Sequence, residues 1–177
     1  MLYGDYYQGS SSSAPHAQLF SVSGTTATFG TDYTLNGGTN SNQQDMCQIP
    51  GTNKVFAAFR QESNSYIKAQ ILDCGSSGLT VTGGSPVSNT YSMEYPTPAW
   101  DSTNNQGYIV MRKGGEMQIA VVTVSGTTVS SVGTAINSNY SMASHKPALA
   151  YRSEDNMLAT MFEDGTSADT GSVSYTH

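Results

Sequence analysis

The sequence predicts an all-β protein assembled from repeated antiparallel units, and three observations lead to this expectation. Charged residues make up only 11% of the 177 residues, less than half of the usual share of about 25%. Glycine is frequent, with 18 residues, and it punctuates short alternating runs in a way that is typical of tight hairpins. Two short motifs also recur at a spacing of about 50 residues.

The first motif is a short apolar strand that ends in arginine. Residues 55–60 (Val-Phe-Ala-Ala-Phe-Arg) match residues 107–112 (Gly-Tyr-Ile-Val-Met-Arg) 52 positions later. A third copy at 157–162 (Met-Leu-Ala-Thr-Met-Phe) follows after about 50 more positions. Each copy comes after a turn-rich stretch, so the motif predicts the second strand of a hairpin.

The second motif is a Ser-Gly hairpin. Residues 20–26 (Phe-Ser-Val-Ser-Gly-Thr-Thr) recur as residues 122–128 (Val-Thr-Val-Ser-Gly-Thr-Thr), displaced by 102 positions, which is two periods. Residues 71–77 lie halfway between these two copies, one period after the first and one period before the second. Glycine supplies the positive φ that such turns need, so a further strand is expected after each hairpin.

Each period therefore contains four short strands, which in the middle copy are expected at 96–101, 107–112, 117–124 and 128–136. Four strands in a repeat of about 50 residues are typical of a β-propeller blade. We predict a single domain over 1–177, a β-propeller-type array of four-stranded antiparallel blades. Its parts are a partial blade 1–40, blades 41–90 and 91–140, and a partial blade 141–177. A sandwich or meander with chance similarity is the alternative.

Both ends of the chain lie within a blade in this interpretation. Residues 2–8 resemble a second strand, and residues 172–177 resemble a third strand. The chain could close a four-bladed ring, share a ring with neighbouring chains, or be a window of a longer polypeptide. Because unpaired edge strands invite pairing, we expect self-association or docking onto other proteins.

Charge and hydropathy exclude two classes of partner. The formal net charge is −6 and the seven basic residues are scattered, a poor match to nucleic acid, which is bound by neutralising phosphates. No apolar run approaches the roughly 20 residues that span a bilayer, so no membrane insertion is expected. Cys47 and Cys74 fall on non-neighbouring strands, and we expect two free thiols.

The repeats resemble those of a known family. Residues 101–112 followed by 122–133, with weaker copies at 47–83 and 147–177, are similar to the β-propeller-like repeats of phage tail-fibre and other virion proteins, and of some large secreted proteins. The resemblance implies a displayed, non-catalytic module on a virion surface or outside the cell. Its implied partners are copies of itself, other virion proteins or a host surface glycan. The second strand departs from the family's Val-Ala-Tyr-like pattern, so the resemblance assigns no ligand.

The sequence carries no clear catalytic constellation. It has no His-Glu-x-x-His, Cys-x-x-Cys or His-x-His spacing and no Gly-x-Ser-x-Gly elbow. We therefore expect neither an enzyme nor a cofactor. The enzymatic alternative is a glycoside-cleaving propeller, which needs a pair of carboxylates. The candidates for that pair are Asp73, Glu94, Asp101, Glu116, Asp164 and Asp169.

A glycan site is the most specific binding hypothesis. Trp100, the only tryptophan, precedes Asp101 and follows Tyr91 and Tyr95. An aromatic face beside a carboxylate can hold the apolar face and the hydroxyls of a sugar. Arg112 ends the repeated strand and can meet an anionic group. Packing of Trp100 between blades and an internal salt bridge of Arg112 are the structural alternatives, and a free lectin is the alternative function.

Overall fold

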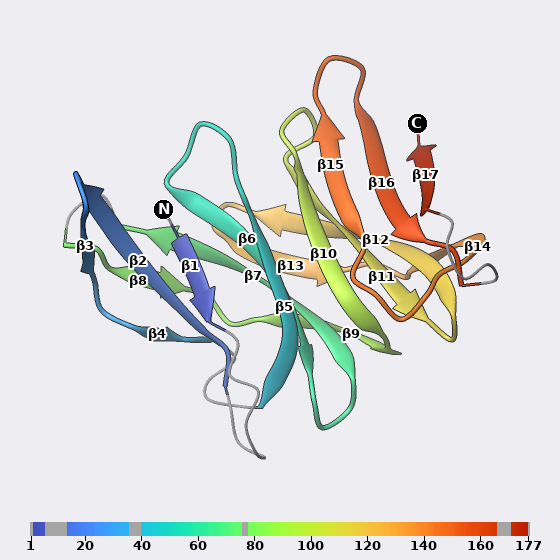
Figure 1. Ribbon diagram of the computed structural model, residues 1–177, viewed down its shortest axis with the longest axis horizontal. Coiled ribbons are helices and arrows are strands. Elements are labelled where there is room, and N and C mark those ends of the chain that lie inside the picture. The colour runs from blue at the N-terminus through green and yellow to red at the C-terminus, as the bar shows by residue number, and fades with distance from the viewer. Residues whose placement is uncertain (1, 6–13, 36–39, 76–77, 166–170, 177) are drawn as a thin grey trace.

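The computed structural model describes residues 2–5, 14–35, 40–75, 78–165 and 171–176 (Figure 1). Its strands form four antiparallel sheets that follow one another along the chain, which confirms the prediction of an all-β, antiparallel protein. Sheets one and four lie at opposite ends of the longest axis, so the described sheets form an open array (Figure 1). The propeller-type arrangement of blades stays a prediction. Within the described ranges, no helix is long and apolar enough to cross a membrane.

The sheets are numbered in chain order. Sheet one contains β1 (Leu2–Asp5), β2 (His16–Ser23), β3 (Thr26–Phe29) and β4 (Tyr33–Thr34). Sheet two contains β5 (Ser41–Gln48), β6 (Lys54–Gln61), β7 (Tyr66–Cys74), β8 (Val81–Gly83) and β9 (Val87–Ser92). Sheet three contains β10 (Glu94–Asp101), β11 (Gln106–Lys113), β12 (Glu116–Ser125), β13 (Thr128–Val132) and β14 (Ile136–Ser141). Sheet four contains β15 (Ala148–Arg152), β16 (Met157–Glu163) and β17 (Gly171–Thr176).

Sheets two and three share one topology. In each, four consecutive strands pair as a meander, in the orders β5-β6-β7-β8 and β10-β11-β12-β13. A fifth strand, β9 or β14, pairs with the other end of the third strand. The expected fourth strand at 128–136 is thus broken into two pieces. In sheet two the break contains Pro86, which cannot donate to the ladder.

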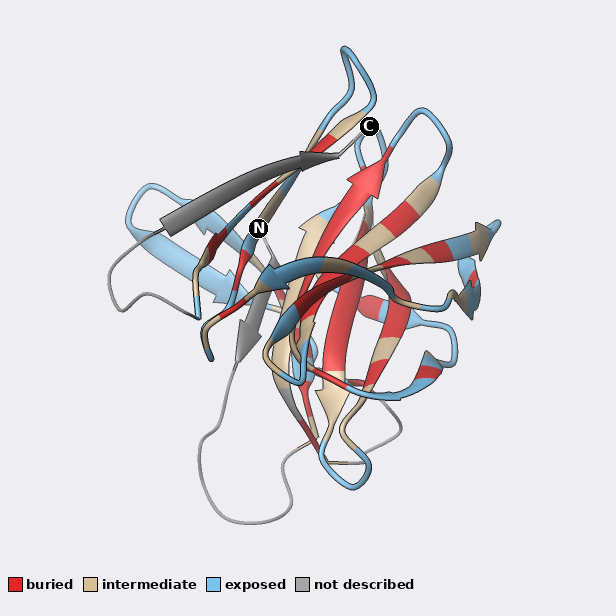
Figure 2. Ribbon diagram, turned by 90° about the vertical axis from the view of Figure 1, so that its right-hand side faces the viewer, coloured by how far each residue is buried: buried red, intermediate tan, exposed pale blue. Residues whose placement is uncertain are grey.

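Apolar side chains fill the spaces between successive sheets. The cluster between sheets two and three is the largest and contains Phe56, Ile71, Trp100, Ile109 and Val122. Smaller clusters join sheet one to sheet two and sheet three to sheet four. β6 is buried on both faces, in keeping with its continuous apolar run. Figure 2 shows buried positions along the central strands and exposed ones at the hairpin tips.

The last repeat is offset from the one before it by 51 positions. Trp100 pairs with Gly107 across one hairpin, and Tyr151 pairs with Leu158 across the next. The sequence alignment, which set residue 157 against Gly107, is therefore wrong by one residue. A slip of one residue turns each side chain to the other face of the sheet. Leu158 consequently faces sheet three and is buried there, whereas its neighbour Ala159 faces away.

Candidate functional site

The residues predicted to bind a glycan fall into two groups, near opposite ends of β10. Trp100 and Asp101 end the strand, whereas Tyr95 and the partner of Arg112, Glu94, begin it. Glu94 and Trp100 are six positions apart along an extended strand, a distance of about 20 Å. The structure therefore does not gather these side chains into one site.

Trp100 belongs to the core between sheets two and three. It is 5% exposed, and its ring centroid lies 5.8 Å from that of Phe56 in an edge-on arrangement. An indole enclosed in this way offers no open face to a sugar. Trp100 thus packs between two sheets, which is the structural alternative to sugar binding that the sequence left open.

Asp101 organises the turn between β10 and β11. Its Oδ1 accepts hydrogen bonds from the backbone N–H groups of Thr103 and Asn104, both at 2.9 Å, and its Oδ2 accepts one from Asn104 Nδ2 at 2.8 Å. Burial by itself raises the pKa of Asp101. The hydrogen bonds from Asn104, Tyr151 and Thr103 outweigh burial and hold the pKa below its ordinary value of 3.8.

Arg112 is held by an internal ion pair. Its Nη1 donates to Glu94 Oε2 at 2.7 Å, and its Nε donates to the carbonyl oxygen of Met142 at 3.0 Å. Its counterpart Arg60 donates to Ser65 Oγ. These contacts match the salt-bridge alternative for Arg112.

The two remaining candidates lie at the start of β10 and on β9. Tyr95 has a positive φ of 55°, and its backbone N–H donates to Gln43 Oε1 at 2.8 Å. Tyr91 is exposed, and Lys113 Nζ lies 4.5 Å from its ring centroid. Tyr95 therefore anchors the start of the strand, and Tyr91 is a surface residue partnered by a cation.

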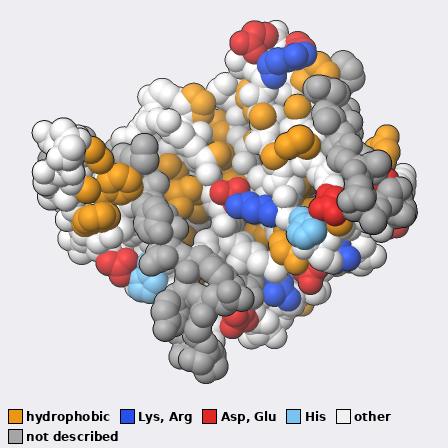
Figure 3. All heavy atoms as spheres, in the orientation of Figure 1, with side chains coloured by type: hydrophobic (Ala, Val, Ile, Leu, Met, Phe, Trp, Pro, Cys, Tyr) orange, Lys and Arg blue, Asp and Glu red, His pale blue; other side chains and the backbone are white. Residues whose placement is uncertain are grey.

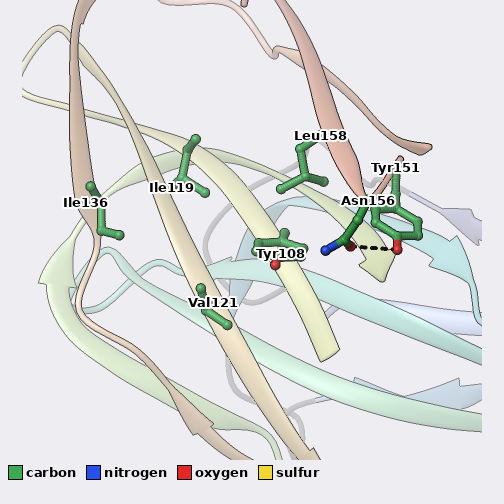
Figure 4. A pocket seen from close by; sticks show the side chains of 7 residues that line it. All are labelled: Tyr108, Ile119, Val121, Ile136, Tyr151, Asn156 and Leu158. Atoms are coloured by element: carbon green, nitrogen blue, oxygen red, sulfur yellow. Dashed lines mark hydrogen bonds between the residues drawn. The ribbon is translucent and has the colours of Figure 1, made fainter. Parts of the chain in front are cut away.

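A pocket of about 330 Å³ lies between sheets three and four. Figure 4 shows apolar side chains from β12 and β14 on one side and side chains from β15, β16 and their connecting turn on the other. Its seven lining residues are Tyr108, Ile119, Val121, Ile136, Tyr151, Asn156 and Leu158. Sequence reasoning did not single out this pocket.

The polar end of the pocket is connected to Asp101. The Tyr151 hydroxyl lies 2.8 Å from Thr103 Oγ1 and 2.9 Å from Asn156 Oδ1, and the Tyr108 hydroxyl lies 3.5 Å from Asp101 Oδ2. Partial burial, and then the nearby Asp101 carboxylate, raise the pKa of both tyrosines. Both hydroxyls are therefore protonated at neutral pH, and they take part in this hydrogen-bond network.

The equivalent of this pocket at the interface between sheets two and three is filled by side chains. Tyr151 corresponds to Trp100, and Leu158 corresponds to Gly107. A Cβ on Gly107 would lie 2.6 Å from the Phe56 ring, so the ring fills this space between sheets two and three. At the interface between sheets two and three, β13, the fourth strand of sheet three, also packs against β7 and β9 of sheet two. The described part of sheet four contains three strands, so it has no fourth strand equivalent to β13 to pack against sheet three.

The remaining candidates for chemistry are dispersed. Within the described residues, no three His, Cys, Asp or Glu side chains form a group that could hold a metal ion. Asp73 accepts a hydrogen bond from Asn53 at 2.8 Å, and Glu116 accepts one from Asn137 at 2.5 Å. Asp169 lies outside the described residues. Asp73 and Glu116 are thus each bound to an asparagine side chain.

Both cysteines are free, on β5 and β7 with β6 between them. Burial, reinforced by the charge of Asp45, raises the pKa of Cys47 from 9.0 to about 12. Burial also raises the pKa of Cys74. Since the thiolate is the reactive form, neither environment activates a nucleophile.

Comparison with known proteins found no matching family model and no matching curated protein.

Proposed function

We propose that this chain is a non-catalytic structural and adhesion module, built from β-propeller-type blades and displayed on a virion or another extracellular surface. Its binding contact is the pocket between sheets three and four, and its ligand is a neutral surface glycan. The pocket is the observation that carries the proposal, because it combines an apolar wall with fixed hydroxyl and amide groups.

The chemistry of the pocket suits a sugar. A sugar ring has apolar C–H faces and a rim of hydroxyls, so its sites combine aromatic or aliphatic surface with a few placed polar groups. Ile119, Val121 and Leu158 supply the apolar surface, and Tyr151 and Asn156 supply the polar groups. Another pocket, lined by residues that include Lys54 and Cys74, has no aromatic side chain in its lining and suits a sugar less well.

The structural part of the proposal rests on how the other candidate residues are used. Trp100 packs in the core, Asp101 holds a turn and Arg112 is ion-paired. The shared topology of sheets two and three supports blades as the repeating unit. The resemblance of the repeats to virion proteins supports display on a particle, where many copies would turn a weak contact into useful avidity.

The test is glycan binding by the chain and its pocket variants. The chain, coupled in many copies to beads, would be screened against neutral and acidic oligosaccharides, and a hit measured by calorimetry. Tyr151→Phe should weaken binding about fivefold, the effect of a hydrogen bond worth about 1 kcal/mol. Val121→Trp, which fills the pocket, should abolish binding while thermal unfolding stays close to that of the parent.

Tyr91→Phe is the matched control, because it removes a tyrosine hydroxyl outside the pocket. Equal losses in Tyr91→Phe and Tyr151→Phe would remove the pocket from the proposal. Failure of every oligosaccharide to bind would refute the adhesion function. Cleavage of a bound oligosaccharide would refute its non-catalytic character.

A further inference from the structure

We propose that the two end faces of the array are complementary docking surfaces. Through them a second copy of this chain binds head to tail, with sheet one of one copy on sheet four of the next. This proposal rests on the proposed display function, which brings many copies of the chain together, and it adds a partner to that function. The two faces lie at opposite ends of the molecule (Figure 1).

The outer face of sheet one is apolar and uncovered. Phe20 and Phe29 are directly opposite each other on β2 and β3, as are Val22 and Ala27. The two phenyl rings lie 5.7 Å apart, while Val22 is 62% and Phe29 60% exposed. Figure 3 shows hydrophobic side chains gathered at the end formed by β2 and β3.

The other face of sheet one is already used. Ala17 and Leu19, which alternate with Phe20 and Val22 along β2, are buried in the cluster shared with sheet two. Successive side chains of a strand point to opposite faces of a sheet. The Phe20 and Val22 face is therefore turned away from the rest of the molecule.

The outer face of sheet four is also apolar. On β16, Met161 is 58% exposed and shares its face with Ala159. Across the ladder, Ala148 lies opposite Met161 and Ala150 lies opposite Ala159, and both of these alanines are exposed. The alternate residue Phe162 is buried against sheet three. The middle of this face thus presents small and flexible apolar side chains, and the charged side chains of Arg152 and Glu163 flank it at the strand ends.

The internal repeat indicates what each face is built to meet. Phe20 and Val22 correspond, two periods earlier, to Val122 and Val124. In sheet three, these valines pack against the preceding sheet as part of the main core cluster. Sheet one has the same kind of face but no preceding sheet among the described residues.

The face of sheet four is the counterpart. Ala159 and Met161 correspond, one period of 51 later, to Tyr108 and Val110. Val110 is buried beneath the sheet that follows it, in a cluster with Phe162. Sheet four of one copy therefore offers the surface on which sheet one of another copy would continue the stacking seen inside the molecule. A second copy of this chain is the occupant that satisfies both faces.

The experiment measures mass by light scattering and sedimentation velocity over a wide range of concentration, without any glycan. The parent should rise above its monomer mass of 18.7 kDa as concentration increases. Phe29→Glu breaks the face of sheet one, and Met161→Glu breaks the face of sheet four. Each variant alone should associate at least about tenfold more weakly, because a buried, unpaired charge opposes the contact.

Mixing the two variants tests the head-to-tail arrangement. Each retains the face that the other has lost, so an equimolar mixture should form a dimer and stop there. Thr28→Glu is the control, because it adds the same charge to β3 on the opposite face from Phe29. Circular dichroism would confirm that all variants keep their sheets.

Three results would overturn the inference. The first is a parent chain that stays monomeric at every concentration, which would mean that the two end faces do not bind a second copy. The second is association that survives both substitutions. The third is a mixture of the variants that fails to dimerise. Because no glycan is present, glycan binding can fail while association succeeds, and the reverse.

Discussion

Asp101 is the residue that ties a turn of the fold to the pocket, because its carboxylate accepts hydrogen bonds from both. Asp101→Asn should lower the free energy of unfolding by about 2 kcal/mol, the usual value for hydrogen bonds to a buried charge. The amide nitrogen cannot accept the bond from Asn104 that the carboxylate oxygen accepts. Urea unfolding at pH 7 would measure the loss. Asp155→Asn, at an exposed ion pair, should cost under about 1 kcal/mol.

The same carboxylate sets a pH dependence. Its pKa in the folded chain is below the ordinary 3.8, so its contribution to stability is complete above that pH. The contribution is lost as the pH falls from 3.8 through the lowered value in the folded state. Unfolding measured from pH 5 downward should therefore show a steeper decline for the parent than for Asp101→Asn. Parallel curves would contradict this role.

At the scale of the element, the hairpin β10–β11 depends on a glycine. A Cβ at position 107 would lie 2.6 Å from two carbons of the Phe56 ring, so Gly107→Ala should destabilise the chain by about 1–3 kcal/mol through overpacking. Phe56→Leu in the same chain should recover part of the loss, because it shortens the clashing side chain. Urea unfolding of the single and double variants would show the coupling, and strictly additive effects would refute it.

The strands were predictable where local pattern decides them. The repeated apolar motif and the Ser-Gly turns predicted β6, β11 and β12 to within about two residues, and they predicted the start of β13 at Thr128. The break after β13 and the start of β14 were missed, because the ladder of β12 accepts a second strand that no local signal marks. The alignment of the last repeat was also wrong by one residue, because its similarity to the other repeats is too weak to fix the register. In the folded chain the burial of Leu158 fixes it.

The candidate site was less accessible to sequence reasoning. Whether Trp100 is open or enclosed depends on Phe56, which is distant in sequence and meets it only when two sheets stack. The pocket likewise joins Tyr108 to Tyr151 across an interface. The signal in the sequence was Tyr151, which occupies the position of Trp100 in the next repeat. The alignment that was wrong by one residue did not pair the two.

For the whole molecule, the distribution of core clusters implies graded stability. Sheets two and three share the largest cluster, whereas sheets one and four each join a cluster with one other sheet among the described residues. Local opening costs less where fewer apolar contacts are lost, so the end sheets should open without the centre. This expectation applies to the monomer, since the proposed stacking of copies would cover the exposed end faces.

Native-state hydrogen exchange at low concentration measures that gradient. Amides of β6, β7, β11 and β12 should exchange at least about tenfold more slowly than those of β2 and β16, which corresponds to a difference of about 1.4 kcal/mol in opening free energy. Raising the concentration should slow exchange in β2 and β16 and leave the central strands unchanged, because only the end faces gain a neighbour. Equal protection in all four sheets would mean that the array unfolds as one cooperative unit. Protection of the central strands alone would place the contact between copies elsewhere.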